Sequence, residues 1–178
     1  GPTGAGKSTL FKLALKSIDP QRGRILVDGL DLSRIDRAAW HAAVAVVPQD
    51  VILLNESLAD NILLGRARDD DRLRHAARKA AILPLIEALP EGLETTVGER
   101  GLKLSGGERQ RIAIARALYG EPAILFLDEA SSALDEATER EIMDHIRALA
   151  NDVTVVAITH RRGIVSPTDR VIDLGGDA

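Results

Sequence analysis

Several residue types and patterns are scarce or missing in this 178-residue sequence. It has no cysteine, which excludes disulfides and thiolate metal sites. Aromatic residues make up only 2% of the chain, too few for a surface that stacks on nucleic-acid bases. The net charge of −4 gives no support for a general nucleic-acid-binding surface either. The longest unbroken apolar run, residues 42–47, is far shorter than the roughly 18 residues of a membrane-spanning helix.

What is present is the composition of a globular domain. Hydrophobic residues make up 45% of the chain and charged residues 28%, and the length suits one domain. The chain does not begin with Met, lacks the basic and then apolar pattern of a signal peptide, and opens inside a glycine-rich motif. We therefore expect it to be a piece of a longer polypeptide.

The hydrophobic pattern predicts an alternation of strands and helices. Helices are predicted at residues 7–18, 108–119 and 136–150 and through most of 55–120, and strands at 24–27, 43–47, 123–127, 153–158 and 170–174. The strand, helix, strand order predicts an α/β fold with a mostly parallel sheet flanked by helices. The apolar composition of strand 43–47 further predicts that it is buried on both faces.

The opening residues match a phosphate-binding loop. Gly1, Gly6, Lys7 and Ser8 have the spacing of the P-loop pattern. The glycines let backbone N–H groups approach phosphate oxygens, and the following helix points the positive end of its dipole at them. Lys7 would add a charge between the β- and γ-phosphates, and Ser8 a hydroxyl for Mg²⁺. The alternative, a chance match, is roughly a one-in-a-hundred event at ordinary glycine content.

Two adjacent acids follow a predicted apolar strand. Asp128 comes directly after residues 124–127 and is expected at the carboxyl edge of the sheet, where α/β proteins bind ligands. There it can hold the Mg²⁺ shell. Glu129 is then a candidate general base that polarises the attacking water. The alternative for Glu129, taken alone, is a helix-capping or surface role, since most acids are structural or solvated.

A second anion-binding segment lies about 100 residues from the first. Residues 104–111 read Leu-Ser-Gly-Gly-Glu-Arg-Gln-Arg. Ser105 is a good helix N-cap, the two glycines free the backbone, and a predicted helix follows. The segment therefore predicts a second helix terminus suited to phosphate, so that one chain carries two half-sites. A chance helix cap would explain Ser105 but not the whole octet.

Together these segments resemble the ATP-binding cassette (ABC) ATPases, whose six motifs occur here in the family's order over essentially the whole chain. They are a Walker A loop (Gly1, Pro2, Thr3, Gly4, Ala5, Gly6, Lys7, Ser8, Thr9), a Q-loop glutamine (Gln49), a signature (Leu104, Ser105, Gly106, Gly107, Glu108), a Walker B strand (residues 124–128) followed by the catalytic Glu129, a D-loop (Ser132, Ala133, Leu134, Asp135) and a switch histidine (His160). Glu108 stands where the family usually has glutamine, which is a common variant.

The resemblance implies ATP hydrolysis with ATP and Mg²⁺. Two cassettes would pair head to tail, so that Ser105 and Gly107 of one close on the γ-phosphate held by the Walker A loop of the other. The implied catalytic residues are Glu129, His160, Gln49 and Lys7, the implied ATP-binding residues are those of the Walker A loop, and the implied Mg²⁺ ligands are Ser8, Gln49 and Asp128. The adenine-stacking aromatic residue of the family would precede Gly1, so Trp40 and Tyr119 are expected to be packing residues.

Residues 96–101, 49–62 and 111–117 resemble ABC exporters in particular. This implies a transmembrane domain as partner, fused upstream, and a place on the cytoplasmic face of a membrane, with no nucleic-acid partner. The alternative is a soluble ABC ATPase that acts on nucleic acid or ribosomes, but the stretch between Gln49 and Ser105 has no room for a coiled-coil insertion. The signature and Glu129 disfavour a kinase or GTPase, and the intact motifs disfavour a cassette without hydrolysis.

The resemblance also implies how the chain is divided. Residues 1–178 would form one nucleotide-binding domain. Within it, residues 1–49 and 121–178 would be the RecA-like ATP-binding core, with a partial antiparallel β-subdomain, and residues 50–120 the helical signature subdomain.

Overall fold

The computed structural model describes residues 6–98, 101–129, 135–148, 153–159 and 165–174. Its main sheet consists of three parallel strands, β3 (Val44–Val47), β4 (Ile124–Asp128) and β5 (Thr154–Ile158), with β4 in the centre. A two-stranded antiparallel sheet is formed by β1 (Leu26–Val27) and β2 (Leu30–Asp31). The turn between β1 and β2 has positive φ at both Asp28 (49°) and Gly29 (81°), which matches the twist of a tight hairpin.

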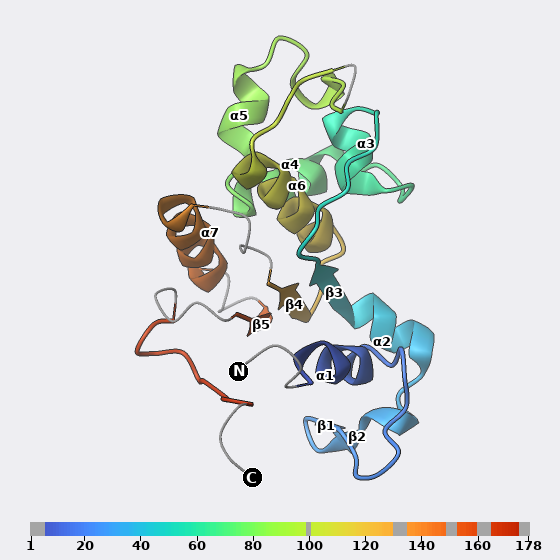
Figure 1. Cartoon of the computed structure of the whole chain (residues 1–178). Coiled ribbons are helices and arrows are strands. Elements are labelled where there is room, and N and C mark those ends of the chain that lie inside the picture. The colour runs from blue at the N-terminus through green and yellow to red at the C-terminus, as the bar shows by residue number, and fades with distance from the viewer. Residues whose placement is uncertain (1–5, 99–100, 130–134, 149–152, 160–164, 175–178) are drawn as a thin grey trace.

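The helices gather at the two ends of the molecule (Figure 1). The lower end in the view holds α1 (Lys7–Ala14) and α2 (Arg37–Ala43), and the upper end holds α3 (Leu58–Leu63), α4 (Asp70–Lys79), α5 (Leu83–Ala88) and α6 (Gly106–Tyr119). Helix α7 (Glu136–Ala148) lies beside the sheet, and two 3₁₀ turns span Leu32–Arg34 and Gly92–Glu94. The predicted α/β fold is confirmed. Within the described part of the chain, no helix is both long and apolar enough to cross a bilayer.

Helix α6 is the centre of the core. Ten of its 14 residues are buried, among them Ile112 and Ala115, which are fully buried. The same core cluster includes Leu58 and Ile62 of α3, together with Leu125 of β4. Because most of its surface is covered, the position of α6 is fixed by packing against several elements at once.

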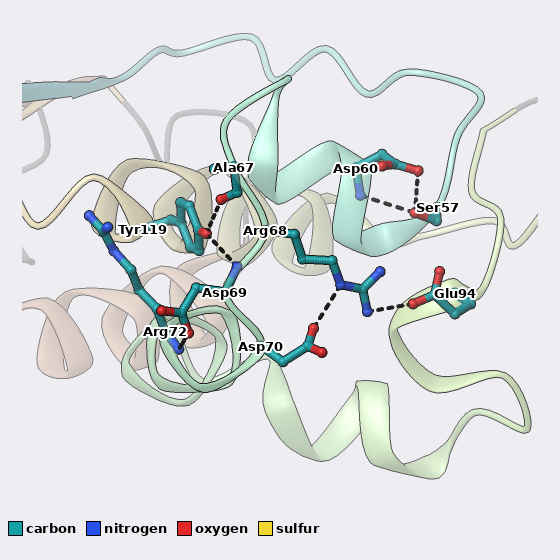
Figure 2. A network of polar contacts seen from close by, with 9 residues as sticks. All are labelled: Ser57, Asp60, Ala67, Arg68, Asp69, Asp70, Arg72, Glu94 and Tyr119. Atoms are coloured by element: carbon teal, nitrogen blue, oxygen red, sulfur yellow. Dashed lines mark hydrogen bonds and ion pairs between the residues drawn. The ribbon is translucent and has the colours of Figure 1, made fainter.

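Tyr119, at the end of α6, fixes the start of α4 (Figure 2). Its hydroxyl donates to the Ala67 carbonyl and accepts from the Asp69 N–H at 3.0 Å. Asp69 in turn caps α4 by accepting from the Arg72 N–H. The guanidinium groups of Arg66 and Arg72 lie 5.0 and 4.9 Å from the ring centroid of Tyr119, within cation–π range. Tyr119 is thus a packing residue.

Aromatic contacts place α1 on the sheet. The Phe11 ring meets the Phe126 ring of β4 edge to face, with centroids 5.1 Å apart. Trp40 of α2 is only 5% exposed, and its indole N–H donates to the Ala14 carbonyl at the end of α1 at 2.9 Å. Trp40 is therefore also a packing residue.

Two predicted features of the secondary structure are wrong. The helix predicted at residues 7–18 ends at Ala14, because Lys16 takes a φ of 54° and its ammonium group donates to the carbonyls of Leu32 and Ile35. The strand predicted at residues 170–174 does not form. Val171 is 65% exposed, and this segment pairs with no strand among the described residues.

The burial predicted for strand 43–47 is only partly correct. Val47 is fully buried, but Val46 on the opposite face is 39% exposed. The other predicted helices and strands that are named above end within two residues of the observed ones.

Candidate functional site

The carboxyl edge of the main sheet brings predicted catalytic residues together. Asp128 ends β4, Glu129 follows it, and Gln49 lies two residues after the end of β3. Because Val47 pairs in parallel with Leu127, Gln49 and Glu129 occupy equivalent positions beyond neighbouring strands. In α/β proteins, ligands bind outside this edge of the sheet.

The start of α1 lies at the same edge. The Lys7 Nζ is 3.8 Å from the Glu129 Oε1, and both side chains are largely buried. Gly6, the N-cap residue of α1, has a φ of 84° that favours glycine. As a glycine, this N-cap residue has no side chain to cap the first turn of α1, and that turn contains no acidic residue. This helix start is therefore suited to accept phosphate oxygens.

The two adjacent acids are held in an unfavourable arrangement. Glu129 has a φ of 45°, a left-handed conformation that costs about 1–3 kcal/mol in a non-glycine residue. Its N–H donates to the Ile158 carbonyl at 3.1 Å, which ties it to the end of β5. Burial, and next the neighbouring charge of Glu129, raise the pKa of Asp128 above its usual value. A bound cation would offset this unfavourable negative charge.

The residues present fit an Mg²⁺ ion shared with a nucleotide. Mg²⁺ in nucleotide sites takes one or two carboxylates and completes its shell with phosphate oxygens and water. Asp128 supplies such a carboxylate, and Ser8 carries an exposed hydroxyl in the first turn of α1. Among the described residues there is no group of three or more acidic or histidine side chains that could hold a metal without such help.

Replacing Asp128 with asparagine is expected to stabilise the nucleotide-free protein at neutral pH. The pKa of Asp128 is raised in the folded state. Below the unfolded-state pKa of about 3.9, such a carboxyl group is protonated in both states and does not lower the free energy of unfolding. As the pH rises through the folded-state pKa, the group lowers the free energy of unfolding. The amide stays neutral, so we expect a melting temperature on the order of 2 °C higher than that of wild type at neutral pH, and a smaller gain in acid.

Thermal melts over a range of pH test this, with Asp135→Asn as the matched control. Hydrogen bonds from the N–H and hydroxyl of Thr138 lower the pKa of Asp135, so its ionised form stabilises the fold and the control should gain nothing. A lower melting temperature for Asp128→Asn at neutral pH would contradict the assignment.

The signature segment forms the N-terminal turn of α6. The Ser105 Oγ accepts from the Glu108 N–H at 3.2 Å, and the Glu108 carboxylate accepts from the Ser105 N–H at 2.6 Å. This reciprocal capping box gives the glutamate at the variant position a structural role. Figure 1 shows the helices α3 to α6 at the opposite end of the molecule from α1.

Gly107 is the point at which α6 meets α7. A Cβ atom at Gly107 would lie 2.7 Å from the Thr138 Cγ2. Thr138 is held in place because its hydroxyl donates to the Asp135 Oδ2 at 2.7 Å, and Asp135 also caps α7. An ion pair of 2.8 Å between Arg111 and Glu141 joins the same two helices. The signature helix and the helix that follows the D-loop are thus packed directly on each other.

Part of the predicted site lies outside the described residues. This applies to Gly1, Pro2, Thr3, Gly4 and Ala5 of the Walker A loop, to Ser132, Ala133 and Leu134 of the D-loop, and to His160. Thr159, the residue before His160, follows β5 at the edge that also holds Asp128 and Glu129.

Sequence reasoning assigned no role to Thr138, Asn61 or Arg116. Asn61 and Arg116 lie in the stretches that resemble exporters, which is the only signal that could have singled them out. Arg116 bonds to backbone carbonyls distant in sequence, Asn61 bonds to backbone groups four to seven residues before it, and Thr138 matters through one methyl group. Contacts of this kind leave no pattern of residue types.

Comparisons with known proteins agree with this geometry. The sequence model of the ABC transporter family matches residues 1–132. An "ATM1-type heavy metal exporter" of Novosphingobium aromaticivorans is 46% identical over 98% of this chain and 29% of its own length. An "Iron-sulfur clusters transporter ATM1, mitochondrial" of Yarrowia lipolytica is also 46% identical, over 98% of this chain and 25% of its own length.

A solved structure gives the same result. It is described as "Structure of a bacterial Atm1-family ABC exporter with ATP bound", and it matches with a TM-score of 0.83 and 46% identity over 98% of this chain and 31% of that one. This chain therefore spans less than a third of the length of these relatives. On the family match, the sequence identity and the shared fold, the chain belongs to the ABC transporter family.

Proposed function

We propose that this chain binds ATP with Mg²⁺, hydrolyses it in a head-to-tail pair of cassettes, and so powers export across a membrane. The observation that carries the proposal is that one chain has two separate helix starts of a kind suited to phosphate, at Lys7 and Ser105. Neither half-site surrounds a triphosphate alone, whereas a second cassette would bring the missing half to each.

In the proposed reaction, Lys7 exchanges its ion pair with Glu129 for the β- and γ-phosphates. Glu129 then accepts a proton from a water molecule, whose oxygen bonds to the γ-phosphorus as the bond to the β–γ bridging oxygen breaks. Gln49 orients this water, and His160 contacts the γ-phosphate. Ser8, Gln49 and Asp128 would hold an Mg²⁺ ion, which would supply positive charge to the phosphate oxygens.

The partner cassette contributes its signature residues to each site. Leu104, Ser105, Gly106, Gly107 and Glu108 would approach the γ-phosphate held by the Walker A loop of the other copy, with the start of α6 directed at it. In this proposal, residues 50–120 form the signature subdomain, and residues 1–49 and 121–178 form the ATP-binding core.

An exporter is favoured over a soluble ABC ATPase by the relatives, which are named as transporters and are more than three times longer than this chain. We propose a transmembrane domain as partner and a place at the cytoplasmic face of a membrane. One relative is named for heavy metals and the other for iron–sulfur clusters, yet both are 46% identical to this chain. We therefore assign the choice of cargo to residues outside the cassette.

Complementation between two inactive variants tests the composite site. Lys7→Ala removes the phosphate-binding lysine, and Ser105→Leu removes the signature serine, so each variant alone is expected to lack ATPase activity. Co-expressed copies would form mixed dimers in which one site keeps both wild-type halves, and activity should reappear.

The controls are each variant purified alone and preparations in which both co-expressed copies carry the same substitution. A mixed preparation no more active than its components would contradict head-to-tail pairing of two copies. Full activity of either variant alone would contradict the role of its residue.

A further inference from the structure

A single arginine joins the segment that follows Gln49 to the signature helix. Arg116 lies in the last turn of α6, and its Nε donates to the Asn61 carbonyl of α3 at 2.8 Å. One terminal nitrogen of the same guanidinium donates to the Ile52 carbonyl at 3.2 Å. Ile52 lies three residues after Gln49, in the stretch between β3 and α3.

Asn61 holds the rest of that stretch. Its side chain is fully buried and binds both backbone polar groups of Leu54. It accepts from the Leu54 N–H at 2.8 Å and donates to the Leu54 carbonyl at 3.0 Å. It also donates to the Ser57 carbonyl at 3.0 Å. Buried amides satisfied in this way fix a single conformation of the backbone they bind. The chain from Ile52 to Ser57 is thus anchored to α3 and, through Arg116, to α6.

Helix α6 extends this anchor to the signature. Ser105 and Arg116 are separated by 11 residues of continuous helix, or roughly 16 Å along its axis. Since most of α6 is buried in the core, it moves as one body. A displacement of the Ile52 carbonyl is therefore passed to the first turn of α6 rather than absorbed on the way.

We infer that Arg116 is a positioning residue that couples the segment after Gln49 to the signature helix. It does so by binding a backbone carbonyl of that segment and a backbone carbonyl of α3. This inference rests on the proposed function. The forked guanidinium suits the task, because it donates from two nitrogens held in a fixed plane, whereas the donors of a lysine ammonium all leave one nitrogen on a flexible stem and do not fix the two acceptors relative to each other.

Arg66 provides a matched control. It also donates to carbonyls at the junction of α3 and α6, namely those of Ile62, Leu63 and Arg116, at 2.7–2.8 Å. None of these bonds reaches the stretch between β3 and α3. Burial lowers the pKa of both arginine side chains, so both sit in comparably desolvated surroundings. Loss of either arginine should weaken the junction of α3 and α6, but only loss of Arg116 should release the segment after Gln49.

The test compares Arg116→Met, Arg116→Lys and Arg66→Met with wild type in the full-length protein. We expect Arg116→Met to lower kcat for ATP hydrolysis about tenfold, with the affinity for ATP within about twofold of wild type, because the phosphate-binding half-site of the same chain is untouched. Arg116→Lys should recover part of kcat, and Arg66→Met should keep kcat near the wild-type value while lowering the melting temperature.

Equal losses of kcat in Arg116→Met and Arg66→Met, or an unchanged kcat in Arg116→Met, would overturn the inference. If Arg116→Met does not fold, amide hydrogen exchange in Arg116→Lys decides. Faster exchange both in residues 50–57 and in residues 105–109 supports coupling, and a change confined to residues 50–57 refutes it. A wild-type protein without ATPase activity would instead refute the proposed function itself.

Discussion

Glu129→Gln will lower the rate of ATP hydrolysis by about 100-fold or more, because a positioned general base contributes at least that much to such reactions. ATP binding will persist, since the phosphate-binding helix start and Lys7 are unchanged. Loss of the carboxylate also frees Lys7 from its ion pair at 3.8 Å. We therefore expect the variant to accumulate as an ATP-bound dimer, visible as a nucleotide-dependent increase in mass by light scattering together with the ATPase rate.

The same substitution at Glu121 is the control. Glu121 lies before the amino end of β4, at the opposite end of this strand from the candidate site. Its carboxylate forms a 3.5 Å ion pair with Arg72. Glu121→Gln should hydrolyse ATP at the wild-type rate. If Glu129→Gln does so as well, Glu129 is not the base.

Gly107→Ala is expected to destabilise the protein by about 1–3 kcal/mol, the usual cost of overpacking, and to abolish most of the ATPase activity. The added methyl group would lie 2.7 Å from the Thr138 Cγ2, and the hydrogen bond from Thr138 to Asp135 keeps that methyl group from rotating away. The signature helix and α7 would have to separate. Melting temperature and ATPase rate measure the two effects.

The double variant Gly107→Ala, Thr138→Ser distinguishes packing from nucleotide contact. Serine keeps the hydroxyl that bonds to Asp135 and removes only the interfering methyl group, so stability and activity should return. Thr138→Ser alone is the control and should resemble wild type. If the double variant regains stability but stays inactive, Gly107 is needed for close approach to the nucleotide and not for packing.

The residues at the carboxyl edge of the sheet could be predicted because the patterns that point to them span only a few neighbouring residues. Asp128 and Glu129 follow an apolar run, Gly6 and Lys7 begin a helix, and Gln49 follows a strand. Once strands β3 and β4 are parallel, Gln49, Asp128 and Glu129 must share an edge, and the ion pair between Lys7 and Glu129 brings the start of α1 to it. The helix starts at Lys7 and Ser105 were predictable for the same reason, since caps and glycines are read within a few residues.

What the sequence did not predict depends on partners distant along the chain. Residues 170–174 have the apolar, β-rich composition of a strand, but strand propensity has no effect without a neighbouring strand to pair with. The helix beginning at Lys7 ends early because Lys16 bonds to carbonyls 16 and 19 residues away. Arg116 likewise acts on carbonyls 55 and 64 residues before it. Long-range bonds to the backbone do not depend on residue type at the acceptor.

The contact between Trp40 and the end of α1 gives the chain an optical probe of its own. Trp40 is the only tryptophan in the sequence, and its indole N–H donates to the Ala14 carbonyl, at the far end of the helix whose first turn is proposed to bind phosphate. Indole emission responds to the polarity and hydrogen bonding around the ring. When it is excited at a wavelength that Tyr119 does not absorb, the tryptophan fluorescence of this cassette therefore reports on the packing of α2 against the end of α1, and it needs no added label.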